Sequence, residues 1–263
     1  GRRQRQMCIR DRERRAIFFD IDGTLVPFGD ERWTDETVGV LKELINRGYD
    51  LFIATGRHHL NTPKYIKESG LFTGFVCLNG QMIFVDDKCV HQAAISDSAI
   101  QGLKNFCNAR DLTVMFASAS YFHLSKPDKD FEAYVEQLTT YKYDPNPDAP
   151  ILQATMYINP DLDKDLQAVI PDCVITRWND RYIDINAKSS SKAEGIKYFM
   201  GKYNIKHENT IAVGDAGNDR SMIKFAGRGI AMGNADFETQ ACADIVIGAD
   251  VDGGIKDLLE ILK

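Results

Sequence analysis

Two aspartates, one residue apart, follow a short apolar run near the start of the chain. In AIFFDIDGTL they are Asp20 and Asp22, and Gly23 comes directly after them. A charged group in an apolar interior is costly unless it is paired, so two carboxylates at the end of a buried strand need a partner that neutralises them. Such a pair can bind a cation, attack an electrophile through one carboxylate and transfer a proton through the other.

Polar residues also follow later apolar runs, and a lysine begins the helical pattern before the last of these runs. The residues are Thr55, Gly56, Asn79, Gly80, Lys192, Asp215, Asn218 and Asp219. In an open sheet of parallel strands, ligands bind at the carboxyl ends of the strands. We therefore expect these residues to converge with the paired aspartates on one edge of a sheet, although they are far apart in the sequence.

The chemistry of this group favours a metal ion and phosphate. Four carboxylates in a small volume raise each other's pKa unless a cation is present. Oxygen ligands without histidine or cysteine suit a hard cation, and a few carboxylates with room for water favour Mg²⁺ over a full Ca²⁺ cage. The Lys192 ammonium, the Thr55 hydroxyl and backbone N–H groups after Asp20 and near Asn218 would complete a pocket for a dianion. Gly23 would let the backbone approach the phosphate closely.

Apolar runs and helical patterns alternate in two parts of the chain. Residues 16–19, AIFF, are continuously apolar, which is typical of a parallel strand buried on both faces. A helix follows over 34–48, with Thr34 as its N-cap and Gly48 at its end. The same alternation predicts strands at 49–55, 74–80, 210–215, 228–232 and 244–247, and helices at 59–69, 192–203, 218–226, 236–241 and 253–262.

The pattern between these two parts is mixed. QMIFV-DDK-CVHQA predicts a hairpin, which a purely alternating parallel sheet would not contain. Helices are then expected at 97–110, 128–141 and 161–169, and strands at 112–117, 120–125, 151–158, 173–178 and 182–186. The economical interpretation is an α/β fold: a doubly wound parallel-sheet, Rossmann-like core with an α/β cap domain inserted after its third strand. The predicted core comprises 16–83 and 187–263, and the predicted cap comprises 84–186.

The first fifteen residues, GRRQRQMCIRDRERR, differ from the rest, with seven arginines, two acids and no hydrophobic period. We interpret residues 1–15 as a disordered extension, or as an artefact of cloning or of the gene boundary, rather than as a nucleic-acid-binding arm. Aromatic residues are absent from them, and the remaining chain holds 25 basic and 36 acidic residues, a formal charge of −11. That surface is poor for binding nucleic acid or an anionic membrane.

Six scattered cysteines, without a CxxC pair, argue against a zinc site or a disulfide scaffold and for a reducing cytosol. No apolar run approaches the roughly 20 residues that span a bilayer, and the first residues hold no apolar stretch of the kind a secretory signal requires. We therefore expect a cytoplasmic protein.

The motifs carry a resemblance to a known family. DIDGTL, IATGR, the lysine in SSSKAEG, and GDAGNDRSM resemble, in this order, the four motifs of the haloacid dehalogenase-like phosphatase superfamily. The inserted block, LNG at its start and MGNA at 232–235 are similar to the Cof-type sugar-phosphate phosphatase branch, which carries a large α/β cap. The resemblance covers nearly the whole chain from residue 16. One small departure is Ala216, where a second glycine is common.

This resemblance implies roles for the candidate residues. Asp20 would be the nucleophile and Asp22 the general acid and base. The implied phosphate-binding residues are Thr55 and Lys192, and the backbone argument adds Gly23, Gly56 and Asn218. The implied metal ligands are Asp20, Asp22, Asp215 and Asp219, with Asp22 ligating through its backbone carbonyl.

Together these features predict a Mg²⁺-dependent phosphatase of small phosphorylated metabolites, with sugar phosphates favoured, acting through an aspartyl phosphate on Asp20. The cap is expected to close over the core and exclude water while Asp22 transfers its proton. A phosphomutase and a non-catalytic regulatory protein on the same scaffold remain alternatives. The expected partner is a small-molecule substrate, without nucleic acid or membrane, and we expect a monomer or a weak homodimer.

Other residues could contact the organic part of a substrate. Those at a predicted turn of the cap are Trp178, Asn179, Arg181 and Tyr182, and weaker candidates are His123 and Lys126. We expect His58 and His59 to be exposed, with contact to the substrate as the alternative, and we expect Arg57 to form a structural ion pair.

Overall fold

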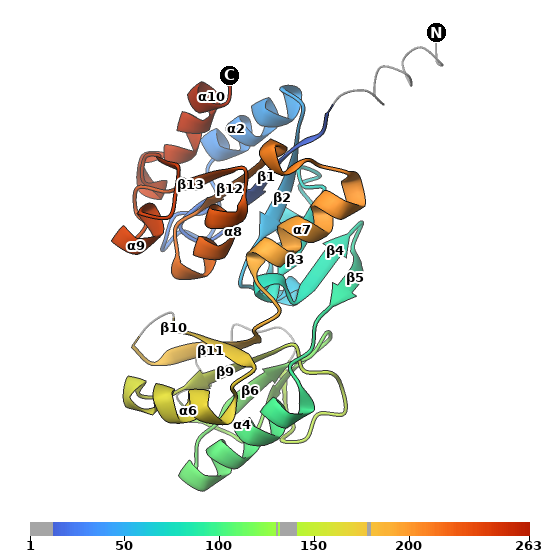
Figure 1. The fold of residues 1–263 in the computed structure, drawn as a ribbon, viewed down its shortest axis with the longest axis vertical. Coiled ribbons are helices and arrows are strands. Elements are labelled where there is room, and N and C mark those ends of the chain that lie inside the picture. Colours follow the sequence, from blue (N-terminus) through green and yellow to red (C-terminus); the bar gives the residue numbers. More distant parts are fainter. Residues whose placement is uncertain (1–12, 130, 132–140, 178–179) are drawn as a thin grey trace. The chain divides into compact units, whose positions relative to one another are not determined.

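The computed structural model describes residues 13–129, 131, 141–177 and 180–263, which form two β-sheets with helices (Figure 1). The larger sheet has the strand order β14-β13-β12-β1-β2-β3-β4-β5, and the smaller has the order β10-β11-β9-β6-β7-β8. By its internal contacts the chain divides into two units. The first unit comprises the residues up to Ala54 together with 69–75 and 192–263, and the second comprises 55–68 and 76–191.

Parallel strands form the sheet of the first unit. They are β1 (Arg15–Phe19), β2 (Tyr49–Ala54), β12 (Thr210–Gly214), β13 (Arg228–Ala231) and β14 (Ile245–Val246). β1 lies between β2 and β12, with Phe19 opposite Ile53 on one side and Val213 on the other. The side chains of β1 from Ala16 to Phe19 are fully buried, as expected for a central parallel strand. The chain therefore leaves β1 at Asp20 from the middle of a sheet.

Helices pack on these strands through aromatic and aliphatic side chains. They are α2 (Asp35–Asn46), α7 (Lys192–Tyr203), α8 (Arg220–Phe225), α9 (Phe237–Gln240) and α10 (Leu258–Ile261). Phe18 of β1 stacks on Phe52 of β2, and Phe199 of α7 contacts both rings. This places α7 over β1 and β2, as Figure 1 shows, and fixes the position of its first residue, Lys192. Thr34 caps α2, as predicted, by accepting a hydrogen bond from the Thr37 N–H.

The second unit contains the smaller sheet, whose strands are antiparallel except for the parallel pair β7 and β8. Its strands are β6 (Val114–Ala117), β7 (Phe122–Leu124), β8 (Tyr141–Tyr143), β9 (Gln153–Tyr157), β10 (Cys173–Arg177) and β11 (Tyr182–Ala187). Helices α4 (Asp97–Arg110) and α6 (Asp163–Val169) bury Leu103, Phe106 and Leu166 against it. This unit therefore has an apolar core of its own.

The predicted hairpin is present as β4 (Met82–Val85) and β5 (Lys88–Gln92), which are antiparallel. Its two-residue turn places Asp86 and Asp87 at positive φ, as a type I′ turn requires. β3 (Gly74–Cys77) lies at the boundary of the two units, and α3 spans Lys64–Lys67. Short 3₁₀ helices are η1 (His59–Asn61), η2 (Leu78–Gly80), η3 (Pro160–Leu162), η4 (His207–Asn209), η5 (Gly217–Asp219), η6 (Asp250–Asp252) and η7 (Gly254–Asp257).

The predicted α/β class with a parallel-sheet core is confirmed. The helix expected at 59–69 is instead two pieces, η1 and α3, because Pro63 cannot continue the first one. The strand β8 was not predicted, and most of the helix expected at 128–141 lies outside the described residues. The domain boundaries near 83 and 187 remain a prediction. Within the described ranges, no helix is long and apolar enough to span a membrane.

Residues 1–12 of the interpreted extension also lie outside the described residues. The last part of that segment is ordered, however. Arg15 is already in β1, one residue earlier than predicted, and Arg14 pairs with Asp50. Glu13 pairs with Lys206, so the first unit begins before Ala16.

Candidate active site

The turn after β1 carries the two aspartates of DIDGT. Asp20 donates its backbone N–H to Val213 of β12 at 3.0 Å, which extends the sheet by one residue. The carbonyl of Ile21 then accepts the N–H groups of the following residues 24, 25 and 26 at 3.3, 3.0 and 2.9 Å, so the chain reverses tightly. Gly23 has φ +77°, a conformation that favours glycine, and a Cβ there would overlap the Asp215 carboxylate. Gly23 is therefore required by both conformation and space.

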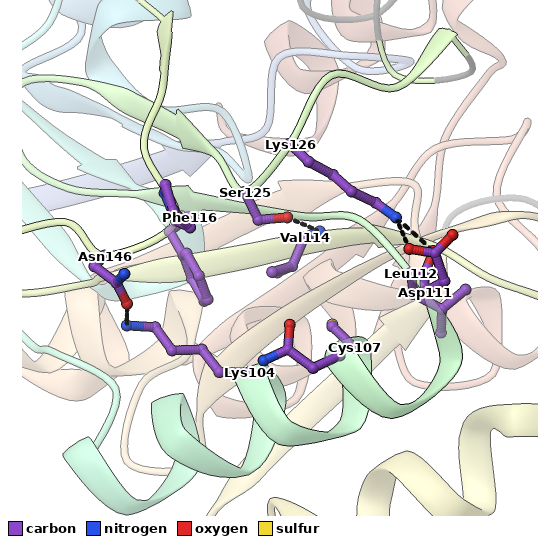
Figure 2. A pocket seen from close by; sticks show the side chains of 11 residues that line it. Lys104, Cys107, Asp111, Leu112, Val114, Phe116, Ser125, Lys126 and Asn146 are labelled. Atoms are coloured by element: carbon purple, nitrogen blue, oxygen red, sulfur yellow. Dashed lines mark hydrogen bonds and ion pairs between the residues drawn. The ribbon is translucent and has the colours of Figure 1, made fainter.

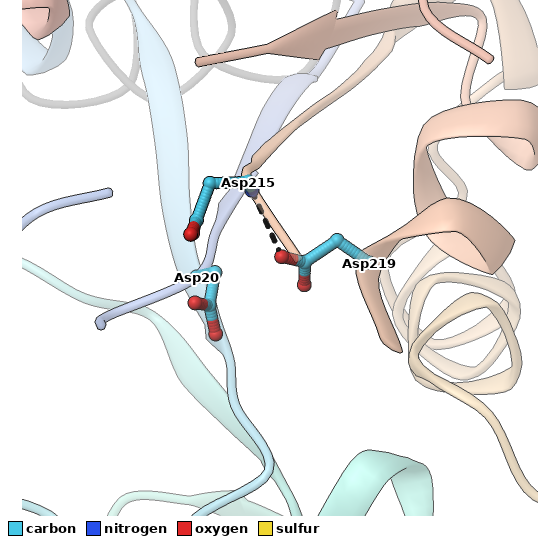
Figure 3. A group of neighbouring side chains, drawn as sticks. All are labelled: Asp20, Asp215 and Asp219. Atoms are coloured by element: carbon cyan, nitrogen blue, oxygen red, sulfur yellow. Dashed lines mark hydrogen bonds between the residues drawn. The ribbon is translucent and has the colours of Figure 1, made fainter. Parts of the chain in front are cut away.

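Three carboxylates meet at the edge of the first unit's sheet. Asp20 follows β1 and Asp215 follows β12, while Asp219 ends η5 (Figure 3). Each offers one carboxylate oxygen within 4.8 Å of those of the other two. Their exposed fractions are only 5%, 4% and 0%, respectively. The predicted convergence of these residues is thus observed.

One buried cation contacts this group. Lys192, which is fully buried, donates from Nζ to Asp20 Oδ1 at 2.7 Å and to Asp219 Oδ1 at 2.5 Å. Three ionised carboxylates and one ammonium leave a net charge of −2 in a nearly water-free space. A buried net charge is unfavourable, so the site needs either protons or a further cation.

Asp219 also shapes the backbone beneath the site. Its Oδ2 accepts the N–H groups of Asp215 at 3.0 Å and of Ala216 at 2.9 Å. Gly214 leaves room for this carboxylate, because a Cβ at that position would lie 2.6 Å from Asp219 Oδ2. Asp219 therefore fixes the start of the loop that presents Asp215.

The pKa values of these residues reflect the excess of negative charge in the site. Burial and the neighbouring carboxylates of Asp219, Asp215 and Asp22 raise the pKa of Asp20 well above its usual range. Together they outweigh the ammonium of Lys192, which acts in the opposite direction. Burial and Asp219 raise the pKa of Asp215 to about 7. For Lys192, burial alone would lower the pKa, but the carboxylates of Asp20 and Asp219 outweigh it and raise the pKa. Asp20 and Asp215 thus hold protons more tightly than free carboxylates do, and a bound cation would lower both pKa values.

These residues fit a hard divalent cation. The donors are carboxylate oxygens, they are close enough to share one ion, and a charge of +2 would cancel their net charge. Such a cation would be held by Asp20 and Asp215, while Asp219 is engaged by Lys192 and by backbone N–H groups.

Two further residues contact the site, and the sequence reasoning gave them no role. Thr24 donates from its hydroxyl to Asp215 Oδ1 at 2.9 Å, and Asn234 donates from Nδ2 to the Gly23 carbonyl at 2.9 Å. The signals that could have found them are the threonine that ends DIDGT and the asparagine of MGNA. Neither residue type points to a role by itself, because threonine and asparagine are common in turns.

The remaining predicted residues differ in their placement. Asp22 is half-buried and its backbone bridges to Val26, but it is not one of the three clustered carboxylates. Asn218 lies half-buried in η5. Thr55 and Gly56 follow β2 and belong to the second unit, where the buried Thr55 accepts the Arg57 N–H at 3.1 Å.

The expectation that His58 is exposed is wrong. Its exposed fraction is 3%, and its Nδ1 accepts the Leu60 N–H at 3.0 Å. Nε2 therefore carries the proton and donates to the Ser118 carbonyl at 2.9 Å, and burial lowers the pKa of this histidine. His58 thus joins the segment after Thr55 to the loop between β6 and β7. Sequence reasoning missed this because the partner lies 60 positions away.

His123, a candidate for substrate contact, is buried in a hydrogen-bonded group. Its Nε2 lies 2.9 Å from the Ser118 hydroxyl and its Nδ1 lies 3.1 Å from Asp144 Oδ2. This is the connectivity of a hydrolase triad, but Ser118 is only 3% exposed and its oxygen also accepts the Tyr121 N–H at 3.3 Å. The arrangement stabilises the loop between β6 and β7 rather than presenting a nucleophile.

Lys126, the other candidate, lines a cavity of about 220 Å³ in the second unit (Figure 2). It pairs there with Asp111, and Lys104 bonds Asn146 across the same cavity. Arg181 lies over the ring of Tyr157, and Tyr182 packs edge-on against that ring. Trp178 and Asn179 lie outside the described residues. The roles suggested for these residues in substrate contact stay predictions.

Comparison with known proteins gives the family. The sequence profile of haloacid dehalogenase-like hydrolases matches residues 17–259, which is most of the chain. This chain belongs to the haloacid dehalogenase-like hydrolase family. The resemblance inferred from the four motifs is therefore confirmed.

Relatives of this hydrolase family cover nearly the whole chain. "Putative phosphatase YkrA" of Bacillus subtilis (strain 168) is 29% identical over 247 residues, or 91% of this chain and 94% of YkrA. Pyridoxal phosphate phosphatase YbhA of Escherichia coli (strain K12) is 26% identical over 273 residues, or 93% of this chain and 97% of YbhA. The solved structure of BT4131, described as a sugar phosphatase of subclass IIB of the superfamily, has a TM-score of 0.86 at 28% identity and covers 94% of this chain and 98% of that chain. The predicted Cof-type branch is thereby confirmed.

Proposed function

We propose that this hydrolase is a Mg²⁺-dependent phosphatase of small phosphorylated metabolites that acts through an aspartyl phosphate on Asp20. The observation that carries the proposal is the buried group of Asp20, Asp215, Asp219 and Lys192 at the end of a central parallel strand. Its oxygen ligands and its net negative charge suit Mg²⁺, and its ammonium suits phosphate. When bound, the ion would supply charge neutralisation for the carboxylates and for the phosphate oxygens.

Asp20 is the proposed nucleophile. Its carboxylate is held at the end of a rigid strand and one of its oxygens, Oδ1, is engaged by Lys192. The other oxygen, Oδ2, is the candidate to attack phosphorus, forming an acyl phosphate and releasing the alcohol. Lys192, whose own charge is stabilised by Asp219, would orient the Asp20 carboxylate for attack and, together with the cation, favour its ionised form.

Asp22 is the proposed general acid and base. It follows Asp20 by two residues in the same tight turn and is half-buried, so it can exchange protons with solvent. In the first step it would give a proton to the leaving oxygen, and in the second it would take one from the water that hydrolyses the acyl phosphate. Both steps then balance, because the proton that Asp22 loses is regained with the attacking water.

Thr55, Gly56 and Asn218 are proposed to hold the phosphate. β2 is the parallel neighbour of β1, and Thr55 follows β2 directly in the sequence. The Thr55 hydroxyl would donate to phosphate, and the backbone at Gly56 and Asn218 would offer N–H groups. We also propose that residues 84–186 form the cap and that the protein is cytoplasmic and monomeric or weakly dimeric.

Sugar phosphates are the proposed substrate class. The supporting fact is the likeness to the sugar phosphatase BT4131. The match to YbhA, whose name specifies pyridoxal phosphate, supports only the wider class of small phosphate monoesters. Sugar phosphates and pyridoxal phosphate are both small phosphate monoesters of an alcohol, and an inserted cap domain could enclose molecules of this size.

The test is phosphate release from a panel of phosphorylated sugars, nucleotides and cofactors, with Mg²⁺ and with EDTA. Asp20→Asn, which keeps the shape of the side chain, serves as the inactive control. We expect turnover that needs Mg²⁺ and disappears in Asp20→Asn. A folded wild-type protein that binds Mg²⁺ but releases no phosphate from any compound would refute the proposal. An isomeric sugar phosphate in place of free phosphate would identify a mutase instead.

A further inference from the structure

Residues of two C-terminal loops hold the turn that carries the paired aspartates. Asn234 donates from Nδ2 to the Gly23 carbonyl at 2.9 Å, and Asp250 Oδ2 accepts the Phe28 N–H at 3.0 Å. The two residues are joined, because the Asp250 N–H donates to Asn234 Oδ1 at 2.9 Å. This group, which we call the Asn234–Asp250 bridge, therefore ties both ends of the 23–28 segment to one point.

A cavity borders this segment on the side of the C-terminal loops. The cavity has a volume of about 330 Å³, and its lining includes Thr24, Leu25, Pro27 and residues 250–253. Side chains that border an open cavity gain few van der Waals contacts across it. Beside this cavity, the hydrogen bonds of the bridge connect the turn to the C-terminal loops, in addition to the packing of the buried Leu25 and Val26.

The residue types of the bridge match its hydrogen bonds atom by atom. Asn234 uses its amide as a donor on one side and its oxygen as an acceptor on the other. Asp250 uses both oxygens as acceptors, from the N–H groups of Phe28 and, at 2.8 Å, of Val251. An aspartate at 234 would face the Gly23 carbonyl with an oxygen, and an asparagine at 250 would lack one acceptor. Each isosteric exchange therefore breaks one defined contact while keeping the side-chain shape.

The bridge acts on residues of the cation site. Gly23, which accepts from Asn234, lies so close to Asp215 that a Cβ would overlap its carboxylate. The next residue, Thr24, donates to Asp215 Oδ1 at 2.9 Å. A displacement of the Gly23 peptide would therefore change the position of Thr24 and the space available to Asp215.

We propose that Asn234 and Asp250 are positioning residues for phosphoryl transfer. They hold the turn so that Asp20, Asp22 and Asp215 keep the spacing that the cation and the phosphate require. This inference rests on the proposed function but acts through the protein's own backbone, and it gives a role to the MGNA segment. Groups that orient metal ligands without touching the metal typically affect metal affinity or activity by about 10- to 100-fold.

The test compares Asn234→Asp with a matched control, Asn204→Asp, an exposed asparagine just after α7. Three properties are measured for each variant. Calorimetry gives the Mg²⁺ affinity, steady-state kinetics with the best substrate of the panel give kcat and KM, and urea unfolding gives the stability. For Asn234→Asp we expect Mg²⁺ affinity, kcat or both to fall by about 10-fold or more, with KM changing less. Stability should change little, because Asn234 is itself exposed and its exchange leaves no cavity. The added negative charge would by itself favour Mg²⁺, so a weaker affinity cannot come from the charge.

Asp250→Asn tests the other end of the bridge and should show the same pattern. Unchanged Mg²⁺ affinity and kcat in folded Asn234→Asp would overturn the proposal, and so would losses no larger than in the control. A fall in activity that only follows a loss of folded protein, with normal Mg²⁺ affinity, would also overturn it. If the wild-type protein releases no phosphate, the proposed function fails, and the Mg²⁺ titration alone decides whether the bridge orients the site.

Discussion

Replacing Lys192 with methionine tests the charge balance of the site directly. Methionine has a similar length and no branch, so it can fill the space of the buried lysine stem. The exchange removes the ammonium that lies 2.7 Å from Asp20 Oδ1 and 2.5 Å from Asp219 Oδ1. The buried net charge of the ionised group would then change from −2 to −3.

The expected loss of stability follows from the burial of these groups. Lys192 and Asp219 are fully buried, and Asp20 is 5% exposed, so solvent does little to screen the remaining charges. Breaking a buried ion pair by removing one partner costs about 3–5 kcal/mol. The loss should be near this range at pH 7.5 without metal. It should be smaller at pH 5, because protonation of carboxylates such as Asp215, whose pKa lies at about 7, relieves the repulsion.

Urea unfolding at pH 5 and pH 7.5, with EDTA and with Mg²⁺, measures these effects. Lys42→Met, at an exposed position of α2, is the control and should change stability by less than about 1 kcal/mol. Mg²⁺ should stabilise Lys192→Met more than it stabilises the wild-type protein, because the ion replaces a missing positive charge. Phosphate release should nevertheless be lost, since the ammonium also orients Asp20.

One result would refute this reasoning. If Lys192→Met were as stable as the wild type at pH 7.5 in EDTA, the ammonium would not be the counter-charge of the carboxylates. The same conclusion would follow if the loss of stability were equal at both pH values and insensitive to Mg²⁺, because a loss of packing alone would behave in that way.

Two further predictions concern the same site. Because the pKa of Asp215 is raised from 3.8 to about 7, the folded protein holds this proton more tightly than the unfolded chain, so the stability of the metal-free protein should fall as the pH rises from 4 to 7. The fall in stability attributable to Asp215 is at most about 4 kcal/mol. Urea unfolding at several pH values measures it, and Mg²⁺ should make stability depend less on pH. A metal-free protein that gains stability between pH 4 and pH 7 would contradict the raised pKa of Asp215. Gly23→Ala should destabilise the protein by about 2 kcal/mol more than Gly29→Ala, because both have positive φ but only the first would overlap Asp215. Equal losses in the two variants, measured by urea unfolding, would show that the turn can move away from the carboxylate.

The sequence predicted much of the local structure. Continuous apolar runs gave the parallel strands that end at Asp20 and at Asp215, because strands buried on both faces carry few polar side chains. The N-cap at Thr34 and the turn at Asp86 were predictable for a similar reason, since the contacts that form them lie within a few residues. The pattern around Pro63 misled local reasoning, which predicted one continuous helix over 59–69 where the structure has two short ones, η1 and α3.

The strand β8 and the burial of His58 were beyond such reasoning. β8 pairs with β7 across residues 125–140, and its side chains from Tyr141 to Tyr143 are exposed, so no apolar run marks it. His58 is buried by a loop whose contact residue, Ser118, lies 60 positions further along. In both cases the deciding contact comes from a distant segment.

The sequence by itself determined which side chains end each central strand, and with them the oxygen-rich chemistry of the site. Only the tertiary structure decided how those side chains meet. The strand order β12-β1-β2 sets Asp20 beside Asp215, and α7 brings Lys192 to them although it follows Asp20 by 172 residues. The same holds for Asn234, whose contact with Gly23 spans 211 residues. Periodicity records the burial of each segment, whereas distances between segments depend on sheet order and packing, which no local pattern encodes.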